Sequence, residues 1–203
     1  IAGCDFLGGA YGGNSITDNV NINDGVFMGG GGGASTFATT PAVRSDGGNG
    51  GGIIFIVADT LVGNSKNIYA NGAASNATVT GQSGAGGGGG GGSVIIQAST
   101  IITPPAIYAK GGNGGDNIDP DGGAGGGGGG GLILTKIGYT GTAEVSGGTG
   151  GHCNTLAMPA ASGIDGYAGS ASGTLQIKIT GLLFNTVFSS RTGTQNDTIC
   201  SGT

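Results

Sequence analysis

Residues 84–99 read GAGGGGGGGSVIIQAS, and residues 123–137 read GAGGGGGGGLILTKI. In both stretches one alanine precedes seven glycines, and the glycines end at a run of aliphatic residues. A flexible linker has no reason to keep such a count, because its properties depend on length and composition and not on individual positions. The two stretches therefore indicate an ordered element that the chain uses more than once.

The overall composition supports ordered glycine. Glycine supplies 53 of the 203 residues, which in a chain without a strict G-X-Y period usually indicates disorder. Disordered chains, however, combine low hydrophobicity with high net charge. This chain is 36% hydrophobic and only 8% charged, with a formal net charge of -5. The glycines are therefore predicted to be structural.

An internal repeat accounts for the glycine content. IFIVADTL from Ile54 aligns with VIIQASTI from Val94 at an offset of 40, and IYANG from Ile68 aligns with IYAKG from Ile107 at an offset of 39. A third copy starts with LILTKI at Leu132, and each copy contains a GGNGG or GGTGG motif or follows one. Self-similarity at a fixed period is the signature of repeat architectures. The sequence thus predicts units of about 40 residues.

Short strands are predicted within each unit. IIFIVA from Ile53 and SVIIQA from Ser93 are β-branched runs that follow glycine, as in strands buried on both faces. No segment has helical periodicity, and glycine disfavours a helix by about 1 kcal/mol per position. We expect an all-β fold with essentially no helix, a repeat solenoid or sandwich in which short strands alternate with polyglycine-II-like extended segments. Its parts would be an N-terminal segment with a possible strand (1–28), the repeat domain (29–173) and C-terminal strands (174–203).

The glycine tracts match the strands in length. Seven residues of a threefold helix of polyproline-II type span about 22 Å at about 3.1 Å per residue, and a six-residue strand spans about 20 Å. Threefold helices make no internal hydrogen bonds, so neighbouring tracts can bond to one another. Only glycine permits the close approach that this requires, as at the collagen axis.

Composition and charge argue against several functions. Six Lys and Arg residues without a basic cluster do not favour nucleic-acid binding, and no apolar run approaches the ~20 residues of a membrane span. The chain begins at Ile1 and not at methionine, which favours a processed, extracellular protein of a cell or virion surface. A fragment of a longer protein is the alternative interpretation. Asn76 and Asn196 lie in sequons and are candidates for glycosylation.

The three cysteines allow at most one disulfide within the chain. Cys4 and Cys200 lie near the two ends, and a bridge between them would join the termini. Cys153 is the third candidate. The alternative, in which all three are buried free thiols, also fits the sequence, because free cysteine is among the most buried residue types.

No catalytic constellation is visible. The one histidine, His152, precedes Cys153, but adjacent residues of an extended chain point to opposite faces and cannot form a dyad. The glycine tracts lead into strands and not into helices, which argues against nucleotide binding. The sequence therefore predicts a protein that is not an enzyme and has no organic cofactor.

A calcium site and a tyrosine stripe are the remaining candidates. The stretch DNIDPDGG supplies the carboxylates of Asp116, Asp119 and Asp121 before a glycine turn, which is compatible with calcium binding. A solvated turn is the alternative interpretation, because the spacing does not fit the EF-hand pattern. Three tyrosines in or near the strands predict either a stacked ladder between repeats or a stripe that binds sugar: Tyr69, Tyr108 and Tyr139.

The tracts at 86–92 and 125–131, with the strands between them, resemble the glycine-rich domains of bacteriophage tail-fibre adhesins, in which packed polyglycine helices form a sandwich. They also resemble glycine-rich repeats of microbial extracellular and surface proteins. The resemblance covers about residues 29–173. The hydrophobic strands between the tracts depart from the adhesin pattern and favour a mixed solenoid of strands and polyglycine segments.

Two functions are expected from these features. The first is a non-catalytic subunit of an extracellular filament or surface assembly that polymerises with copies of itself, helped by apolar end segments such as LLFNTVF at 182–188. The second is an adhesin that binds a receptor or surface glycan with loops at 73–83, 116–121 and 154–167. An ice-binding surface is a third alternative, but the sequence has no regular TxT ladder.

Overall fold

The computed structural model describes residues 9–16, 26–35, 45–75, 84–118, 122–136, 139–153, 158–159 and 167–171. All regular elements within these ranges are strands, so the expected all-β fold without helix is confirmed for the part of the chain described. The strands are β1 (Ile53–Val62), β2 (Asn67–Tyr69), β3 (Ser93–Ile102), β4 (Ala106–Tyr108), β5 (Leu132–Lys136), β6 (Ala143–Glu144), β7 (His152–Cys153), β8 (Met158–Pro159) and β9 (Tyr167–Ala171).

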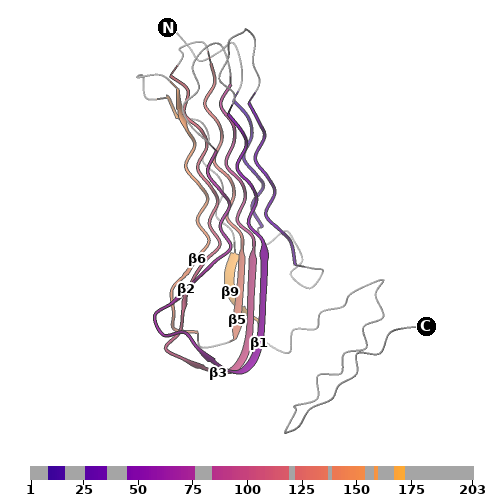
Figure 1. Cartoon of the computed structure of the whole chain (residues 1–203), viewed down its shortest axis with the longest axis vertical. Helices are drawn as coiled ribbons and strands as arrows, with labels where there is room; N and C mark the ends of the chain where they lie inside the picture. The colour runs from indigo at the N-terminus through magenta and orange to yellow at the C-terminus, as the bar shows by residue number, and fades with distance from the viewer. Residues whose placement is uncertain are drawn as a thin grey trace, which may run out of the picture.

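Seven of the strands form two parallel sheets at one end of the described structure (Figure 1). One sheet has the order β1-β3-β5-β9 and the other the order β2-β4-β6, while β7 and β8 form an antiparallel pair. The register places Ile54 beside Val94 and Ile68 beside Ile107. These are the residues that the sequence offsets of 40 and 39 align. Equivalent segments therefore lie side by side.

Tight turns connect β1 to β2 and β3 to β4, and so join the first sheet to the second. Between β1 and β2, the N–H of Lys66 donates to the carbonyl of Gly63 at 2.8 Å. The two central residues, Asn64 and Ser65, have φ of 46° and 56°, the left-handed region that asparagine tolerates better than most residues. The turn sends the chain back alongside the strand it has left.

The hydrophobic core lies on both faces of β3. One cluster fills the space between the two sheets, with Val94, Ile96, Ile107 and Ile133 at its centre. A second cluster covers the opposite face of β3 and β5: Ile16, Ile95, Leu132 and Leu134. A parallel strand covered on both faces reads as a continuous apolar run and not as an alternating one, which explains the sequence SVIIQA.

The glycine tracts continue the strands as long, wavy segments that run side by side (Figure 1). The central one, at 84–92, donates to a different neighbour at each successive position and returns to the same neighbour every third residue. The N–H groups of Ala85, Gly88 and Gly91 donate to Gly123, Gly126 and Gly129; those of Gly87 and Gly90 to Gly33 and Gly30; those of Gly89 and Gly92 to Ala73 and Ala70. A period of three is the spacing expected of extended threefold segments.

The carbonyl groups of the central tract bond outward in the same way. They accept from Ala10 and Gly13, from Gly48 and Gly51, and from Gly112 and Gly115. The central tract is therefore bonded to segments 9–16, 26–35, 45–52, 70–75, 109–118 and 122–131. Together with the central tract and with 145–153, which bonds to 109–118 and 122–131, these segments form three rows. The middle row consists of 45–52, 84–92 and 122–131, one outer row of 9–16 and 26–35, and the other outer row of 70–75, 109–118 and 145–153.

Close backbone packing is what requires glycine in the central tract. A Cβ at Gly87, Gly88, Gly89, Gly91 or Gly92 would lie 2.0–2.2 Å from a backbone oxygen of a neighbouring segment. A Cβ at Gly86 or Gly90 would meet an oxygen at 2.7 Å. None of these seven glycines has a φ in the left-handed region. Glycine is thus needed here for space and not for an unusual backbone conformation.

Candidate interaction surfaces

A polar face is built from every third residue of the outer row at 109–118 and 145–153. Asn113 and Asp116 are exposed, as are Thr149 and His152, whereas the glycines at 112, 115, 148 and 151 are buried. In these outer segments two residues of three face neighbouring segments, and in the GGNGG and GGTGG motifs both of these residues are glycine. The third faces solvent and can carry a side chain. The central residue of each motif, Asn113 in GGNGG and Thr149 in GGTGG, occupies this solvent-facing position.

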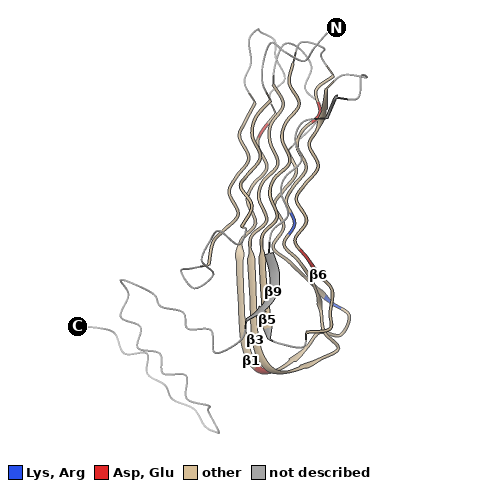
Figure 2. Cartoon of the chain, turned by 180° about the vertical axis from the view of Figure 1, so that it is seen from behind, with Lys and Arg blue, Asp and Glu red and all other residues tan. Residues whose placement is uncertain are grey.

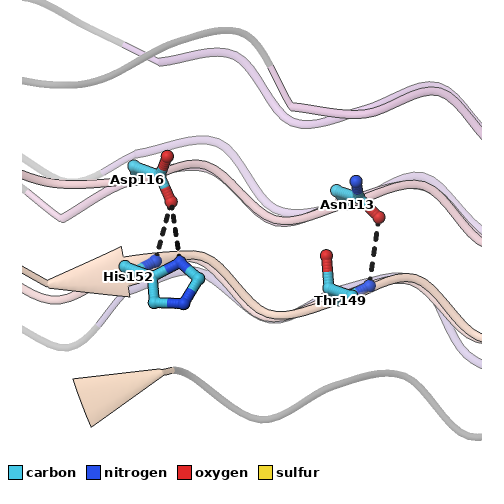
Figure 3. Close-up of polar contacts among 4 residues, drawn as sticks. All are labelled: Asn113, Asp116, Thr149 and His152. Carbon is cyan, nitrogen blue, oxygen red and sulfur yellow. Dashed lines mark hydrogen bonds and ion pairs between the residues drawn. The ribbon is translucent and has the colours of Figure 1, made fainter. Parts of the chain in front are cut away.

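Side-chain oxygens on this face accept from the outward-pointing N–H groups of the next segment (Figure 3). Asn113 Oδ1 accepts from the N–H of Thr149 at 3.1 Å, and Asp116 Oδ1 accepts from the N–H of His152 at 2.7 Å. Asn71 Oδ1 accepts from the N–H of Lys110 at 2.9 Å in the same manner. These contacts give backbone donors at the surface a protein partner, and they fix the side chains of the polar face in a regular array.

His152 and Asp116 also approach each other through their side chains, with 3.6 Å between Nδ1 and Oδ1. Both side chains are more than half exposed, so a charged pair here would contribute little to stability. The adjacent Cys153 is buried. The expected opposite orientation of the two neighbours is therefore seen, and the pair does not form a nucleophile and base.

Two of the three tyrosines stack. The rings of Tyr69 and Tyr108, paired across β2 and β4, have centroids 5.2 Å apart and planes 15° apart. Asn67 Nδ2 donates to the hydroxyl of Tyr69 at 2.7 Å. The third, Tyr139, donates its hydroxyl to the carbonyl of Pro105, and partial burial raises the pKa of that hydroxyl. The stacked-ladder interpretation thus holds for Tyr69 and Tyr108 and not for Tyr139.

A cation lies next to the stacked rings. Lys110 Nζ is 5.4 Å from the ring centroid of Tyr108 and forms an ion pair with Glu144. The hydrogen bond to Glu144 raises the pKa of Lys110 above its ordinary value. Because the lysine is exposed, the pair orders the surface more than it stabilises the fold.

The outer edge of β1 is the second candidate surface. Ser93 N–H donates to Gly52 O, so the even-numbered residues in the first half of β1 bond to β3, and the N–H and C=O groups of Ile53, Phe55 and Val57 point away from the sheet. Their side chains are 45%, 42% and 52% exposed. Two further apolar residues, Phe27 and Met28, are 42% and 68% exposed. They belong to the segment 26–35, which lies beside the tract 45–52 that leads into β1. The edge is thus long and apolar.

The ends of the tracts form the third candidate surface. Ser35 N–H donates to Ser45 O at 2.9 Å, and the hydroxyls of Ser45 and Ser75 are 2.8 Å apart. Gly86 N–H reaches the Ser45 hydroxyl at 3.2 Å. These serines stand at the starts and ends of described segments, which therefore meet at the end of the tracts opposite the sheets (Figure 1).

Several candidate residues fall outside the described ranges. Of the calcium candidates only Asp116 is described, and Asp119 and Asp121 lie outside. No group of three His, Cys, Asp or Glu side chains suited to a metal occurs among the residues described, and the calcium site stays a prediction. The sequons at Asn76 and Asn196 are outside as well.

The cysteines are described in part. Cys153 is buried at 2% exposure and is disulfide-bonded. Cys4 and Cys200, the other two disulfide candidates, both lie outside the described residues. Cys153 belongs to β7 and lies at the end of the outer row.

No family model matches the chain, and no curated protein or solved structure matches it significantly. Within the described ranges, the structure contains no helix that could cross a membrane. The interpretation of function therefore depends on the surfaces themselves. The sequence motifs predicted the close packing of the glycines. They did not predict that side-chain oxygens of Asn71, Asn113 and Asp116 accept hydrogen bonds from backbone N–H groups of the next segment. The three-residue spacing of polar residues such as Asn113 and Asp116 is the pattern that could have indicated this.

Proposed function

We propose that this chain is a non-catalytic structural subunit of an extracellular filament or surface layer. Its scaffold would be a solenoid of glycine-rich repeats, in which each unit contributes two strands and two tracts, and the tracts pack as polyglycine-II helices. The period-three hydrogen bonding of 84–92 to its neighbours supports the scaffold. The parallel register of β1 with β3 and of β2 with β4 supports the stacking of units.

The energetics favour collective order over isolated tracts. Ordering one residue costs about 1–2 kcal/mol, and a backbone hydrogen bond contributes about 0.5–1.5 kcal/mol net. A single tract bonded to one neighbour would therefore not stay ordered. The central tract uses its N–H and C=O groups on all sides, and the apolar clusters of the sheets add burial at the base of every unit. Such stabilisation grows with the number of stacked units.

The edge of β1 carries the proposal of assembly. Natural sheets protect their edge strands with lysine, proline, bulges or covering segments, because an open edge is a template for pairing with another chain. β1 is ten residues long, contains no lysine or proline, and has one charged residue, Asp59. A strand of this kind is suited to intermolecular pairing.

Electron microscopy of the protein from its native source tests this function. We expect fibres or sheets whose thickness matches stacked copies of the chain. A particle that stays monomeric and monodisperse at millimolar concentration, without fibres in the native material, would contradict the proposal.

A second function, binding of a receptor or surface glycan, is favoured by the gathering of the tract ends at one end of the scaffold. Loops on a rigid support are the usual place for recognition, and the hydroxyls of Ser45 and Ser75, at the ends of two described segments, lie 2.8 Å apart. Binding to a glycan array is the measurement. Replacing 76–83 with a glycine-serine segment of equal length should change binding without changing the melting temperature. Unchanged binding after all three expected loops are replaced would exclude this function.

A further inference from the structure

We infer that the end layer, residues 45–75, binds a second copy of this chain by parallel strand addition, so that both sheets continue from one copy into the next. The end layer consists of tract 45–52, β1, β2 and tract 70–75. The inference rests on the proposed function, because it names the surface through which copies assemble.

The strands of the end layer stand first in both sheets. The order β1-β3-β5-β9 begins with β1, and the order β2-β4-β6 begins with β2. The outward N–H and C=O groups of Ile53, Phe55 and Val57 repeat the arrangement by which β3 receives β1. A parallel strand set one position further out would find the same donors and acceptors that β1 uses within the sheet.

The glycine tract of the end layer has open donors with the same spacing. Gly48 and Gly51 N–H groups donate to the central tract, but among the described residues Asn49 and Gly50 N–H groups have no acceptor. In the central tract every N–H from Ala85 to Gly92 is donated. An extended glycine-rich segment is the chemical partner that could approach a tract this closely and accept from it.

The polar face ends abruptly at the end layer too. The N–H groups of Lys110, Thr149 and His152 each have a side-chain cap from the preceding segment, whereas Asn71 N–H has none among the residues described. The Tyr69 ring stacks on Tyr108 on one side only and is 58% exposed. A further layer of the same design would supply both a cap and an aromatic ring.

Charge is consistent with burial of this surface. The only charged residues at 45–75 are Asp46, Asp59 and Lys66, and charged residues are sparse along the described tracts and strands (Figure 2). Desolvation of this layer would therefore cost little. A partner recognised through charge, such as a basic peptide, has little to bind here.

These observations together indicate which partner binds the end layer. Strand edges alone would accept many peptides, but the strand edge, the open glycine donors and the uncapped polar face are complementary together to one kind of surface. That surface is a strand-and-tract layer, which a second copy of this chain carries. Because β1 and β9 lie at opposite edges of the same sheet, a parallel contact between copies is head-to-tail and leads to an open polymer.

The test compares Val57→Pro and Phe55→Lys with the matched control Val57→Thr in the full chain. The N–H of Val57 points to the open edge, so proline there removes no internal hydrogen bond, and Val57→Thr keeps that N–H. Sedimentation velocity and electron microscopy measure assembly, and thermal unfolding measures folding. We expect the parent and Val57→Thr to polymerise, and the two edge variants to need at least tenfold higher concentration.

Hydrogen exchange on the parent protein makes the test independent of how the variants fold. The N–H groups of Ile53, Phe55 and Val57 should be protected in polymers and unprotected after dilution to monomer. Protection that persists in the monomer would show that a segment of the same chain covers the edge, and would overturn the inference.

The outcomes separate the inference from the function it rests on. Polymers that form equally well from the parent, Val57→Pro and Phe55→Lys, with no protection of β1, would overturn the inference and leave the assembly function standing. A parent chain that never polymerises would overturn both.

Discussion

At the scale of single residues, the distance to the neighbouring backbone decides whether a position in this chain requires glycine. Gly51 and Gly52 are adjacent, yet their surroundings differ. A Cβ at Gly51 would lie 2.0 Å from Ala70 O, whereas a Cβ at Gly52 would meet no atom within 4 Å. Neither has a left-handed φ. The same residue type therefore has a structural requirement at one position and none at the next.

This contrast gives a matched pair of variants. Gly51→Ala should destabilise the protein by about 1–3 kcal/mol, the usual cost of overpacking. Gly52→Ala should be neutral or slightly stabilising, because alanine restricts the unfolded chain more than glycine does. Urea unfolding of both variants checks the prediction. Equal free energies of unfolding for the two variants would show that the tracts accommodate a side chain at both positions and would contradict the prediction.

From the sequence, it could be predicted that the tracts need glycine for close packing, but not at which single positions. Runs such as 86–92 indicated close packing, because nothing else explains their length. The solvent-facing positions Asn113 and Thr149 were visible as GGNGG and GGTGG, but their role depends on which segment lies beside them. That information belongs to the three-dimensional arrangement of the tracts and not to any one stretch of the sequence.

At the scale of elements, strands and tracts are coupled because each of the strands β1 to β6 adjoins a tract directly. The offset of 40 between Ile54 and Val94 predicted which strands are equivalent, and their pairing follows it. The place of 9–16 was not predicted. Its N–H groups donate to Ala85, Gly88 and Gly130, but it belongs to no recognisable copy of the repeat, so its sequence gave no sign of this packing.

Capping between neighbouring elements leads to a prediction for Asn113. Asn113→Ala removes the acceptor for Thr149 N–H and leaves that donor to water, so we expect a loss of about 0.5–1 kcal/mol. Asn113→Asp keeps an oxygen at the same place and should retain most of the stability. Chemical denaturation measures both. A loss for Asn113→Asp as large as for Asn113→Ala would contradict a capping role.

At the scale of the whole molecule, the described residues form one scaffold with three distinct surfaces. The polar face displays ordered side chains at every third position, the tract ends bring Ser35, Ser45 and Ser75 together, and the end layer offers open strand edges. The scaffold can hold these surfaces only if the glycine tracts are rigid. Hydrophobic clusters beside β3 hold the tracts in place at one end. Over the rest of their length, the tracts are held by hydrogen bonds to one another.

Amide hydrogen exchange of the central tract tests this rigidity most directly. We predict that the N–H groups of residues 87–92 exchange only through global unfolding, which for a domain of about 5 kcal/mol means protection on the order of 1,000-fold or more. Amides of β3 should be protected to a similar degree, since the two segments unfold together. Exchange at 87–92 within about tenfold of the rate in an unstructured peptide, with β3 still protected, would show that the tracts are spacers and contradict the account.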